Sequence, residues 1–455
     1  MTKYDLIIIG AGVGGYTAAI KAAQEGLKTA IIEKDKFGGV CLNKGCIPVK
    51  RFFEVSKRIL DMNKSETIGI KSSYEFDWQQ ILQSKDQIVK KLSTGVEFLL
   101  KGHMIDSYKD EAKIIDKNKI QVGEEILETD NLILACGSRP LAVLSNLPCQ
   151  DKIINSDGVF NLEALPASIL IVGGGVIGVE FANIFSALGV NTSLVELMPE
   201  ILPGIDNEFV RLAKREYQKR GIKFHTSTKI DKLEKNENNI TAICSNGQEI
   251  QCDLILEAVG RTPNMDIPLA LELELDNNGR IKVDKKMLTS IPNVYAIGDI
   301  TGSWLLAHVA AHEGIVAVEN ICKKESEMNY EHIPLSIFTV PEISWIGKTE
   351  DDFIKESRTI KIGKFLMAAN GKALTMDKKE GMVKLIADEK DGIILAGGVI
   401  GADASSLIGE IGLACKNKLK ATDIYKTIHS HPTLTETILE AAMDIDKKAI
   451  HKVYR

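Results

Sequence analysis

Hydrophobic and polar positions alternate in blocks along the chain, and the blocks have the lengths of strands and helices. Residues 5–33 run as an apolar strand, a glycine-rich turn, an alanine-rich helical stretch and a second apolar strand that ends in an acid. Residues 169–196 repeat this order, which predicts two βαβ units. A third segment, residues 293–321, begins as a strand and resumes as a helix near Leu306.

The remaining segments predict strands of other kinds. Residues 101–130 mix alternating apolar positions with many charges, as solvent-exposed strands do. Residues 132–140 and 254–264 each form an apolar strand followed by a glycine-containing turn. From about residue 333, strands precede a helical end. We therefore predict an α/β protein with two Rossmann-like dinucleotide-binding domains and a C-terminal α+β domain, packed as one body because no Pro-, Gly- or Ser-rich linker separates them.

Composition narrows the class of protein. The chain has 455 residues, 44% hydrophobic and 26% charged, which is typical of a folded protein of several domains. Its net charge of -6 argues against nucleic acid as a partner. The start, MTKYDLIIIGAG, predicts a strand rather than a secretory leader, and no apolar run is long enough for a membrane span. We expect a cytoplasmic location.

The two βαβ units each contain a G-x-G-x-x-G turn. Glycines at these positions permit a tight turn, close approach of a pyrophosphate and close helix packing, while an acid at the end of the second strand can bind ribose hydroxyls. The acid lies 18 residues after the last glycine in both copies. The candidate cofactor contacts are Gly10, Gly12, Gly15 and Glu33 in the first copy and Gly173, Gly175, Gly178 and Glu196 in the second. Two dinucleotides are therefore expected.

Two of the eight cysteines, Cys41 and Cys46, lie close together in GGVCLNKGCIP. Half a zinc site is one alternative, but no second cysteine cluster completes it, and we predict no metal. A pair of ordinary free thiols is another. On a regular helix the two Cα atoms would be about 8–9 Å apart, too far for a disulfide, so a bridge requires a distortion near Gly45 and Pro48. A redox-active disulfide beside a flavin explains the pair best.

Four polar residues complete the candidate chemistry. His431 and Glu436, in HSHPTLTE, form a possible acid–base pair, with Pro432 as the expected first helical residue and His431 at the cap. A histidine that only caps a helix is the alternative. Asp299, at the end of a strand, is placed to hold sugar-like hydroxyls, although it could also be an Asp in a turn. Lys50, four residues after Cys46, could lie beside the flavin or simply be solvated.

These residues make the chain resemble the flavin-dependent pyridine nucleotide-disulfide oxidoreductases over essentially its full length. The specific segments are GGVCLNKGCIP and HSHPTLTE. The resemblance implies FAD and NAD as cofactors and oxidation of protein-bound dihydrolipoyl groups with reduction of NAD. It also implies an FAD domain (residues 1–142 and 266–332), an inserted NAD domain (143–265) and an interface domain (333–455) that forms a homodimer.

The resemblance also assigns roles to single residues. Cys41 would exchange with the lipoyl sulfur, and Cys46 would contact the flavin. His431 and Glu436 would act on the disulfide centre of the partner subunit. Lys50 would lie near the flavin, paired with Glu180. Asp299 would hold the ribityl chain, and further cofactor contacts would come from Gly137, Ala307 and Gly260. The expected partner is a lipoyl-carrying protein of a 2-oxo acid dehydrogenase or glycine cleavage complex.

Two departures and two rival functions remain. Val49 stands where the family commonly has Ser or Thr, and Cys136 replaces the usual Thr of an A-T-G turn, so we expect altered local hydrogen bonding. A glutathione or mercuric reductase is the nearest rival, but no cysteine pair follows Cys415. A non-catalytic dinucleotide-binding subunit is the other rival, and it would need neither the thiols nor His431.

Overall fold

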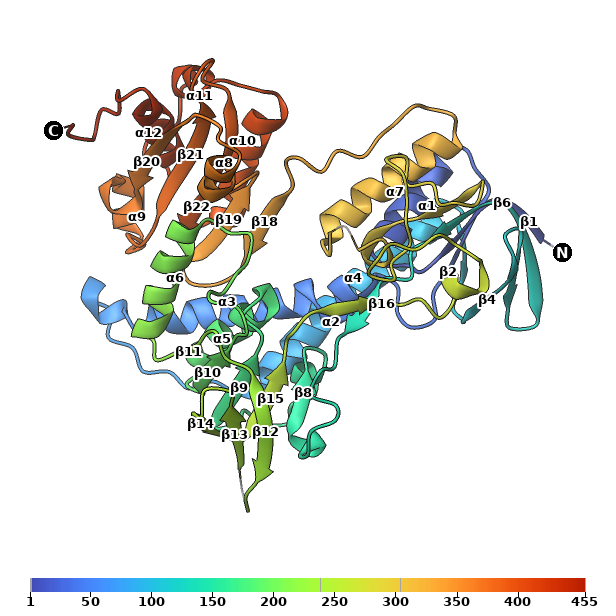
Figure 1. Cartoon of the computed structure of the whole chain (residues 1–455), viewed down its shortest axis with the longest axis horizontal. Coiled ribbons are helices and arrows are strands. Elements are labelled where there is room, and N and C mark those ends of the chain that lie inside the picture. Colours follow the sequence, from blue (N-terminus) through green and yellow to red (C-terminus); the bar gives the residue numbers. More distant parts are fainter. Residues whose placement is uncertain (1, 238, 303, 455) are drawn as a thin grey trace.

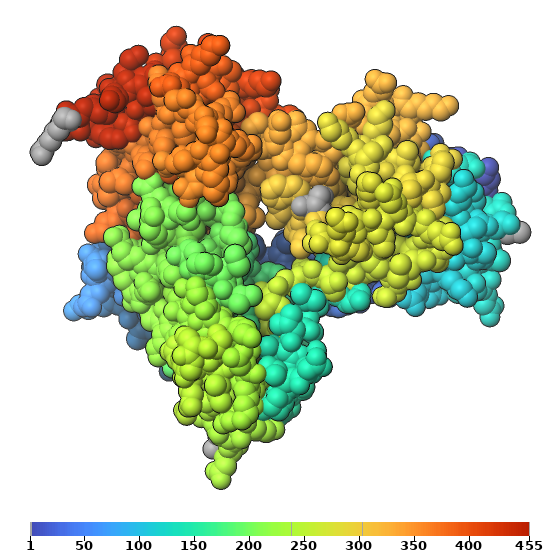
Figure 2. All heavy atoms as spheres, in the orientation of Figure 1, coloured from blue at the N-terminus to red at the C-terminus, as the bar shows by residue number. Residues whose placement is uncertain are grey.

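The protein is described by a computed structural model covering residues 2–237, 239–302 and 304–454. Its chain forms three lobes, each built on its own sheet (Figure 1). In the space-filling view the C-terminal lobe rests on the lobe that contains the second βαβ unit, and a notch separates it from the rest of the molecule (Figure 2).

The first lobe contains a seven-stranded sheet in the order β3-β2-β1-β6-β5-β4, with β17 paired to β6. Strands β1, β2, β3, β6 and β17 are parallel, while β4 and β5 form an antiparallel extension. The strands are β1 (Thr2–Ile9), β2 (Thr29–Ile32), β3 (Asp106–Tyr108), β4 (Ala112–Asp116), β5 (Lys119–Val122), β6 (Glu125–Leu134) and β17 (Val294–Ala296). Helices α1 (Val13–Gln24) and α7 (Ala307–Ile321) pack closely together, because Gly14 and Gly314 leave no room for a Cβ between them.

The second lobe repeats the parallel arrangement. Its five-stranded sheet has the order β11-β10-β9-β15-β8, so β9, β10 and β11 correspond to β1, β2 and β3 of the first lobe. The strands are β8 (Ile153–Asn155), β9 (Ser168–Val172), β10 (Asn191–Val195), β11 (Lys223–His225) and β15 (Leu254–Glu257). Helices α5 (Val176–Ala187) and α6 (Asn207–Lys219) connect them, and an antiparallel sheet of β12 (Ile230–Lys235), β13 (Ile240–Cys244) and β14 (Glu249–Cys252) packs alongside. The repeat predicted from the sequence is therefore present.

The C-terminal lobe has an antiparallel sheet in the order β18-β19-β22-β21-β20. The strands are β18 (Pro334–Ile337), β19 (Glu342–Ile346), β20 (Ile360–Leu366), β21 (Met382–Asp388) and β22 (Ile394–Gly401). The helices are α8 (Glu350–Lys355), α9 (Gly371–Thr375), α10 (Ala404–Lys416), α11 (Ala421–Lys426) and α12 (Glu436–Ile445). This lobe is the α+β unit that the composition predicts.

The lobes are joined by shared structure rather than by linkers. A two-stranded ribbon of β7 (Ser138–Pro140) and β16 (Arg261–Pro263) connects the first two sheets. Helices α2 (Gly39–Lys44), α3 (Cys46–Met62) and α4 (Trp78–Gly102) lie between the lobes (Figure 1). One core cluster contains Phe52 of α3, Phe181 of α5 and Trp345 of β19, each almost fully buried. The three lobes therefore pack as one body, as expected.

Candidate functional site

The two thiols lie at a break between helices. Helix α2 ends at Lys44, and α3 begins at Cys46, with Gly45 between them at φ -142° and ψ -110°. The break brings the Cα atoms of Cys41 and Cys46 to 4.7 Å, and the two residues form a disulfide. Both residues are half-buried. The distortion that a bridge requires is therefore present at Gly45.

The thiol-bearing helix α2 begins against the first glycine turn. Gly39, at φ +62°, has no room for a side chain, because a Cβ there would lie 2.5 Å from the Cα of Gly12. Asn43 anchors the same helix by donating hydrogen bonds to the carbonyls of Phe37 and Gly39 at 3.1 and 2.9 Å. The disulfide is thus held next to the turn that was predicted to bind a dinucleotide.

The two glycine turns have matching geometry. A Cβ on Gly15 would lie 1.9 Å from the carbonyl oxygen of Gly10, and a Cβ on Gly178 would lie 2.0 Å from that of Gly173. Gly10 and Gly173 both have positive φ, at +102° and +111°. These four glycines are required by packing and backbone conformation.

The middle glycine of each turn has no such explanation in the protein itself. Gly12 and Gly175 have φ values of -66° and -72°, which any residue adopts, and a Cβ on either would meet no atom within 4 Å. Each also stands at the N-cap of a twelve-residue helix. Open space at a helix N-terminus fits the pyrophosphate of a dinucleotide, which helix N–H groups attract.

The acids that follow the turns hold them in shape. Glu33 accepts hydrogen bonds at 2.8 Å from the backbone N–H groups of Ala11 and Asp35. Glu196 accepts from the N–H groups of Gly174 and Met198 in the same way. Each carboxylate oxygen retains a second lone pair for a ribose hydroxyl.

Lys50 and Glu180 form the ion pair that the family resemblance implies. The Lys50 Nζ atom lies 3.1 Å from both carboxylate oxygens of Glu180, whose side chain is 6% exposed. Lys50 is one turn after Cys46 on α3, and Glu180 is on α5, so the pair links the thiol helix to the second lobe. Phe338 completes the group: its N–H donates to Glu180 at 2.9 Å, and its ring centroid lies 4.2 Å from Lys50 Nζ.

Asp299 lies in a polar group assembled from three distant segments. The Ser138 hydroxyl donates to its carboxylate, and the Arg261 Nε atom lies 4.0 Å from it. Arg261 also donates to the Ser138 hydroxyl and carbonyl at 2.7 Å. Ser138 and Arg261 follow the positive-φ residues Gly137 and Gly260 directly, and the duplicated strand-and-glycine pattern is the signal that could have identified them. Ala307, also predicted, begins α7 nearby in sequence.

The expected helix start at Pro432 is wrong. Helix α12 begins at Glu436, and residues 431–435 form a turn instead. The turn is favoured because Glu436 accepts the Thr433 N–H at 2.8 Å, and the Thr433 hydroxyl donates to the Ser430 carbonyl at 2.7 Å. Glu436, not His431, is therefore the residue at the helix N-terminus, where a carboxylate is favoured.

His431 and Glu436 are nevertheless paired. The His431 Nδ1 atom lies 2.9 Å from Glu436 Oε1. Burial acts to raise the pKa of Glu436, but the hydrogen bonds from Thr433 and His431 outweigh it, and the pKa is lowered from its usual value. An ionised carboxylate only accepts, so Nδ1 carries the proton and Nε2 of a neutral imidazole is available as a base. The His431 side chain is 80% exposed, and α12 lies in a different lobe from the thiols (Figure 1).

Of the two residues that depart from the family pattern, Val49 is buried and Cys136 is half-buried. Val49 is 7% exposed and belongs to the core cluster of α3. Burial raises the pKa of the Cys136 thiol to about 12, and its Sγ atom contacts the Ile9 carbonyl at 3.8 Å. Cys136 is therefore an inert thiol at neutral pH.

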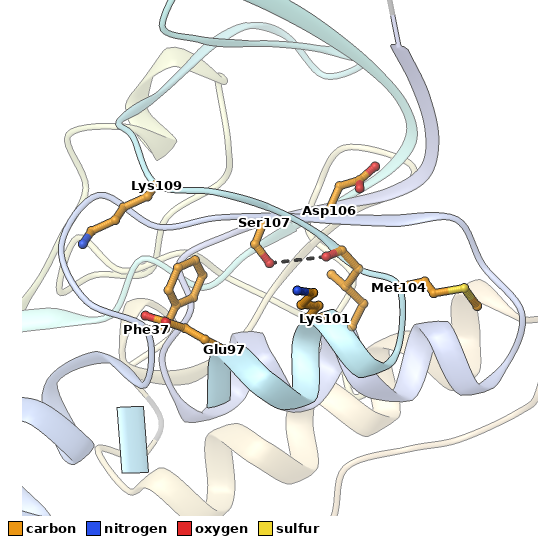
Figure 3. A pocket seen from close by; sticks show the side chains of 8 residues that line it. Phe37, Glu97, Lys101, Met104, Asp106, Ser107 and Lys109 are labelled. Carbon is orange, nitrogen blue, oxygen red and sulfur yellow. Dashed lines mark hydrogen bonds between the residues drawn. The ribbon is translucent and has the colours of Figure 1, made fainter. Parts of the chain in front are cut away.

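A hollow of about 610 Å³ lies along the edge strand β3. It is lined by residues of α4, β3 and the loop after β2, including Phe37, Lys101 and Ser107 (Figure 3). None of its lining residues is a thiol or a predicted cofactor contact. Across the described ranges, no cluster of His, Cys, Asp or Glu could hold a metal ion. No helix in the described part of the chain has the length and apolar character needed to cross a membrane.

Comparisons with known proteins agree with the family resemblance. The family model "Pyridine nucleotide-disulphide oxidoreductase" matches residues 4–314, and the model of that family's dimerisation domain matches residues 333–442. The dihydrolipoyl dehydrogenase of Geobacillus stearothermophilus is 39% identical over 96% of this chain and 95% of that protein. That of Thermus scotoductus is 38% identical over 100% of both chains.

Solved structures share the fold. LpdA from Mycobacterium tuberculosis superposes with a TM-score of 0.90 at 24% identity, covering 97% of this chain and 99% of that one. The flavoprotein disulfide reductase RclA from Escherichia coli gives a TM-score of 0.88 at 24% identity, with the same coverage. The chain has two glycine turns with a disulfide between them in the sequence, and the family matches extend along nearly its whole length. It therefore belongs to the pyridine nucleotide-disulphide oxidoreductase family.

Proposed function

We propose that this chain is a dihydrolipoyl dehydrogenase that oxidises protein-bound dihydrolipoyl groups and reduces NAD. The observation that carries the proposal is the Cys41–Cys46 disulfide, held at a helix break against the first glycine turn. Full-length identity of 38–39% to dihydrolipoyl dehydrogenases supports it. We infer an FAD domain of residues 1–142 and 266–332, an NAD domain of residues 143–265 and an interface domain of residues 333–455. The β7–β16 ribbon, where the chain passes between the first two sheets, supports these boundaries.

The open space beside Gly12 and Gly175 suits FAD and NAD. Gly10, Gly15 and Glu33 would shape the FAD turn, with Gly137, Asp299 and Ala307 as further contacts. Gly173, Gly178, Glu196 and Gly260 would do the same for NAD. When bound, FAD supplies the exchange of an electron pair between a thiolate and the nicotinamide.

The first chemical step is thiol–disulfide exchange. His431 of one subunit removes a proton from the incoming dithiol, and Glu436 stabilises the resulting imidazolium. The dihydrolipoyl thiolate attacks Cys41 Sγ, which breaks the Cys41–Cys46 bond and releases Cys46 as a thiolate. The second lipoyl sulfur then attacks the mixed disulfide, releases the cyclic lipoyl disulfide and leaves two reduced cysteines. Cys46 opens the 17-residue helix α3, a position that stabilises a thiolate.

The proposal requires a homodimer. His431 is largely exposed and belongs to the lobe that matches the family's dimerisation domain, so we infer that it serves the disulfide of a second subunit. Lipoyl-carrying domains of a 2-oxo acid dehydrogenase or glycine cleavage complex are the inferred partners, and the cytoplasm is the inferred location.

Two single variants test the roles of the thiols. Cys41→Ser should show a long-wavelength thiolate-to-flavin absorption band without added reductant, because Cys46 is then unpaired. Cys46→Ser should abolish the band in the reduced protein. The reverse pattern would show that the two roles are exchanged.

Steady-state NAD reduction by dihydrolipoamide, compared with NADPH- or NADH-driven reduction of oxidised glutathione, tests the substrate. Faster glutathione reduction would overturn the proposal.

A further inference from the structure

Phe338 connects the C-terminal lobe to the ion pair beside the thiols. It lies between β18 and β19 and is half-buried. Its backbone N–H donates to Glu180 Oε1 at 2.9 Å, and its ring centroid lies 4.2 Å from Lys50 Nζ. The ring also packs edge-on against Phe53, with centroids 5.8 Å apart at 77°. One residue therefore contacts both members of the Lys50–Glu180 pair.

The contacts constrain Lys50 from two sides. Both carboxylate oxygens of Glu180 lie at 3.1 Å from its ammonium, and the aromatic face covers a further side. Lysine is otherwise a flexible side chain, and this one is 29% exposed, so water has access to it. A cation over an aromatic face is favoured by roughly threefold to thirtyfold in population, depending on how dry the site is.

Lys50 is also placed to act on Cys46. The two residues are four apart on α3 and so lie on the same face, one turn from each other. An ammonium next to a sulfur favours the thiolate over the thiol. The effect depends on the ammonium staying in one position, because Coulomb attraction falls with distance and with hydration.

We propose that Phe338 is a positioning residue that holds the Lys50 ammonium against the Cys46 thiolate and the flavin-facing side of α3. Only the part of this proposal that concerns the flavin rests on the proposed function. The contacts among Phe338, Lys50 and Glu180 are formed within the chain itself. It extends the site to the C-terminal lobe of the same subunit. The backbone N–H fixes the Glu180 carboxylate, and the ring fixes the lysine.

Side-chain replacement separates these two contributions, because every variant keeps the backbone N–H. In Phe338→Leu the aromatic face is lost, and Phe338→Met is a second variant of similar volume whose unbranched side chain is longer and more adaptable. Phe338→Tyr keeps the face and should behave as the parent. Phe53→Leu is the matched control: Phe53 is 3% exposed and packs on the same ring, so its loss weakens packing without removing the cation's partner.

The experiment uses the FAD-loaded full-length protein in a Cys41→Ser background, where Cys46 is unpaired. The rate of Cys46 alkylation by iodoacetamide, measured against pH, reports the thiolate without relying on the flavin. The pH midpoint of the thiolate-to-flavin band reports it through the flavin. Phe338→Leu and Phe338→Met should raise both midpoints by up to about 1.5 units, because the shift cannot exceed the roughly thirtyfold change in the population of the Lys50 position. Phe338→Tyr and Phe53→Leu should leave them unchanged.

The outcomes distinguish a positioning role of Phe338 from a packing role, and they test the contact between Cys46 and the flavin separately. If Phe338→Leu lowers the melting temperature as Phe53→Leu does but leaves the alkylation midpoint unchanged, Phe338 is only a packing residue and the inference is wrong. Equal midpoint shifts in Phe338→Leu and Phe53→Leu would lead to the same conclusion. If the alkylation midpoint shifts while no flavin band exists at any pH, Phe338 positions Lys50 as inferred, but the proposed contact between Cys46 and the flavin fails.

Discussion

Replacing Lys384 by methionine should destabilise the junction between the C-terminal lobe and α6. Lys384 lies on β21 with its side chain 1% exposed, and its Nζ atom is 2.8 Å from Asp206, 2.6 Å from Glu350 and 3.4 Å from Glu208. Glu350 and Glu208 are 33% and 29% exposed and can be hydrated when the ammonium is gone. Asp206, at 3% exposed, keeps the backbone N–H of Glu208 as the one donor to its side chain among the described residues.

The expected loss of folding free energy follows from the Asp206 carboxylate, which stays buried without its lysine partner. Removing one partner of a buried ion pair costs about 3–5 kcal/mol, and hydration of the two outer acids favours the lower end, about 3 kcal/mol. For a cooperative unit of 150–250 residues this lowers the melting temperature by about 6–12 °C. Lys364→Met is the matched control, because Lys364 is 36% exposed and, within the part of the chain that the structure describes, pairs with Glu208 alone at 2.6 Å. It should cost about 1 kcal/mol or less.

The pH dependence of the destabilisation by Lys384→Met provides a second test. Burial opposes the charge of Lys384, but the hydrogen bonds that it donates to Asp206 and Glu350 outweigh burial and raise its pKa. Its contribution is therefore complete at neutral pH and is lost only as pH rises through the folded-state pKa, above about 10.4. Burial acts to raise the pKa of Glu208, but the hydrogen bonds and charges of Lys364 and Lys384 outweigh burial, so the pKa is lowered overall. That contribution is present above about pH 4.3 and is lost as pH falls through the lowered value, so the difference between variant and parent should shrink in acid.

Trp345 makes the assay local. It is 2% exposed and packs edge-on against Phe209 of α6, with ring centroids 5.3 Å apart. In a background with Trp78→Phe and Trp304→Phe, which leaves it as the one tryptophan of the sequence, its fluorescence reports this junction during thermal unfolding. All variants are compared at saturating FAD, because bound cofactor shifts the transition. Adding Asp206→Asn to Lys384→Met should restore part of the loss by removing the buried charge. Equal melting temperatures for Lys384→Met and Lys364→Met, or no recovery in the double variant, would refute the reasoning.

Three further predictions concern the proposed site. Gly175→Ala should fold normally, because its Cβ meets nothing within 4 Å. It should raise KM for NAD by about tenfold, which corresponds to a loss of about 1.4 kcal/mol in binding. An unchanged KM would show that no pyrophosphate approaches this turn. Glu196 repels a 2′-phosphate, so kcat/KM should favour NAD over NADP by about 100-fold, and Glu196→Ala should reduce that ratio. His431→Ala should slow dihydrolipoamide oxidation by about 10²–10⁴-fold while NADH oxidation by artificial acceptors persists. Mixing it with Cys41→Ser subunits should restore activity if His431 acts across the dimer, and confirmed subunit exchange without recovery would place the whole site in one chain.

The parts of the site built by neighbouring residues were predictable from the sequence. The last glycine of each turn is specified within about six residues, because a Cβ on it would lie 1.9–2.0 Å from the carbonyl oxygen of the first glycine. The first glycine is favoured locally by its positive φ. The acids follow at a fixed distance, set by the length of the intervening helix and strand. The Cys41–Cys46 bridge was predictable for the same reason, since Gly45 lies between the thiols and permits the break that joins them.

Tertiary structure alone decided the contacts between distant segments. Asp299 is joined to Ser138 and Arg261 because two strands that follow separate sheets pair as one ribbon. Phe338 reaches Lys50 because the C-terminal lobe packs on α3, and no local pattern around residue 338 indicates this. The start of α12, by contrast, was decided locally, by side-chain hydrogen bonds within a turn that competed with the helix predicted from Pro432. Local sterics are encoded in adjacent residues, whereas the pairing of buried charges and aromatic rings depends on which surfaces meet when the whole chain has folded.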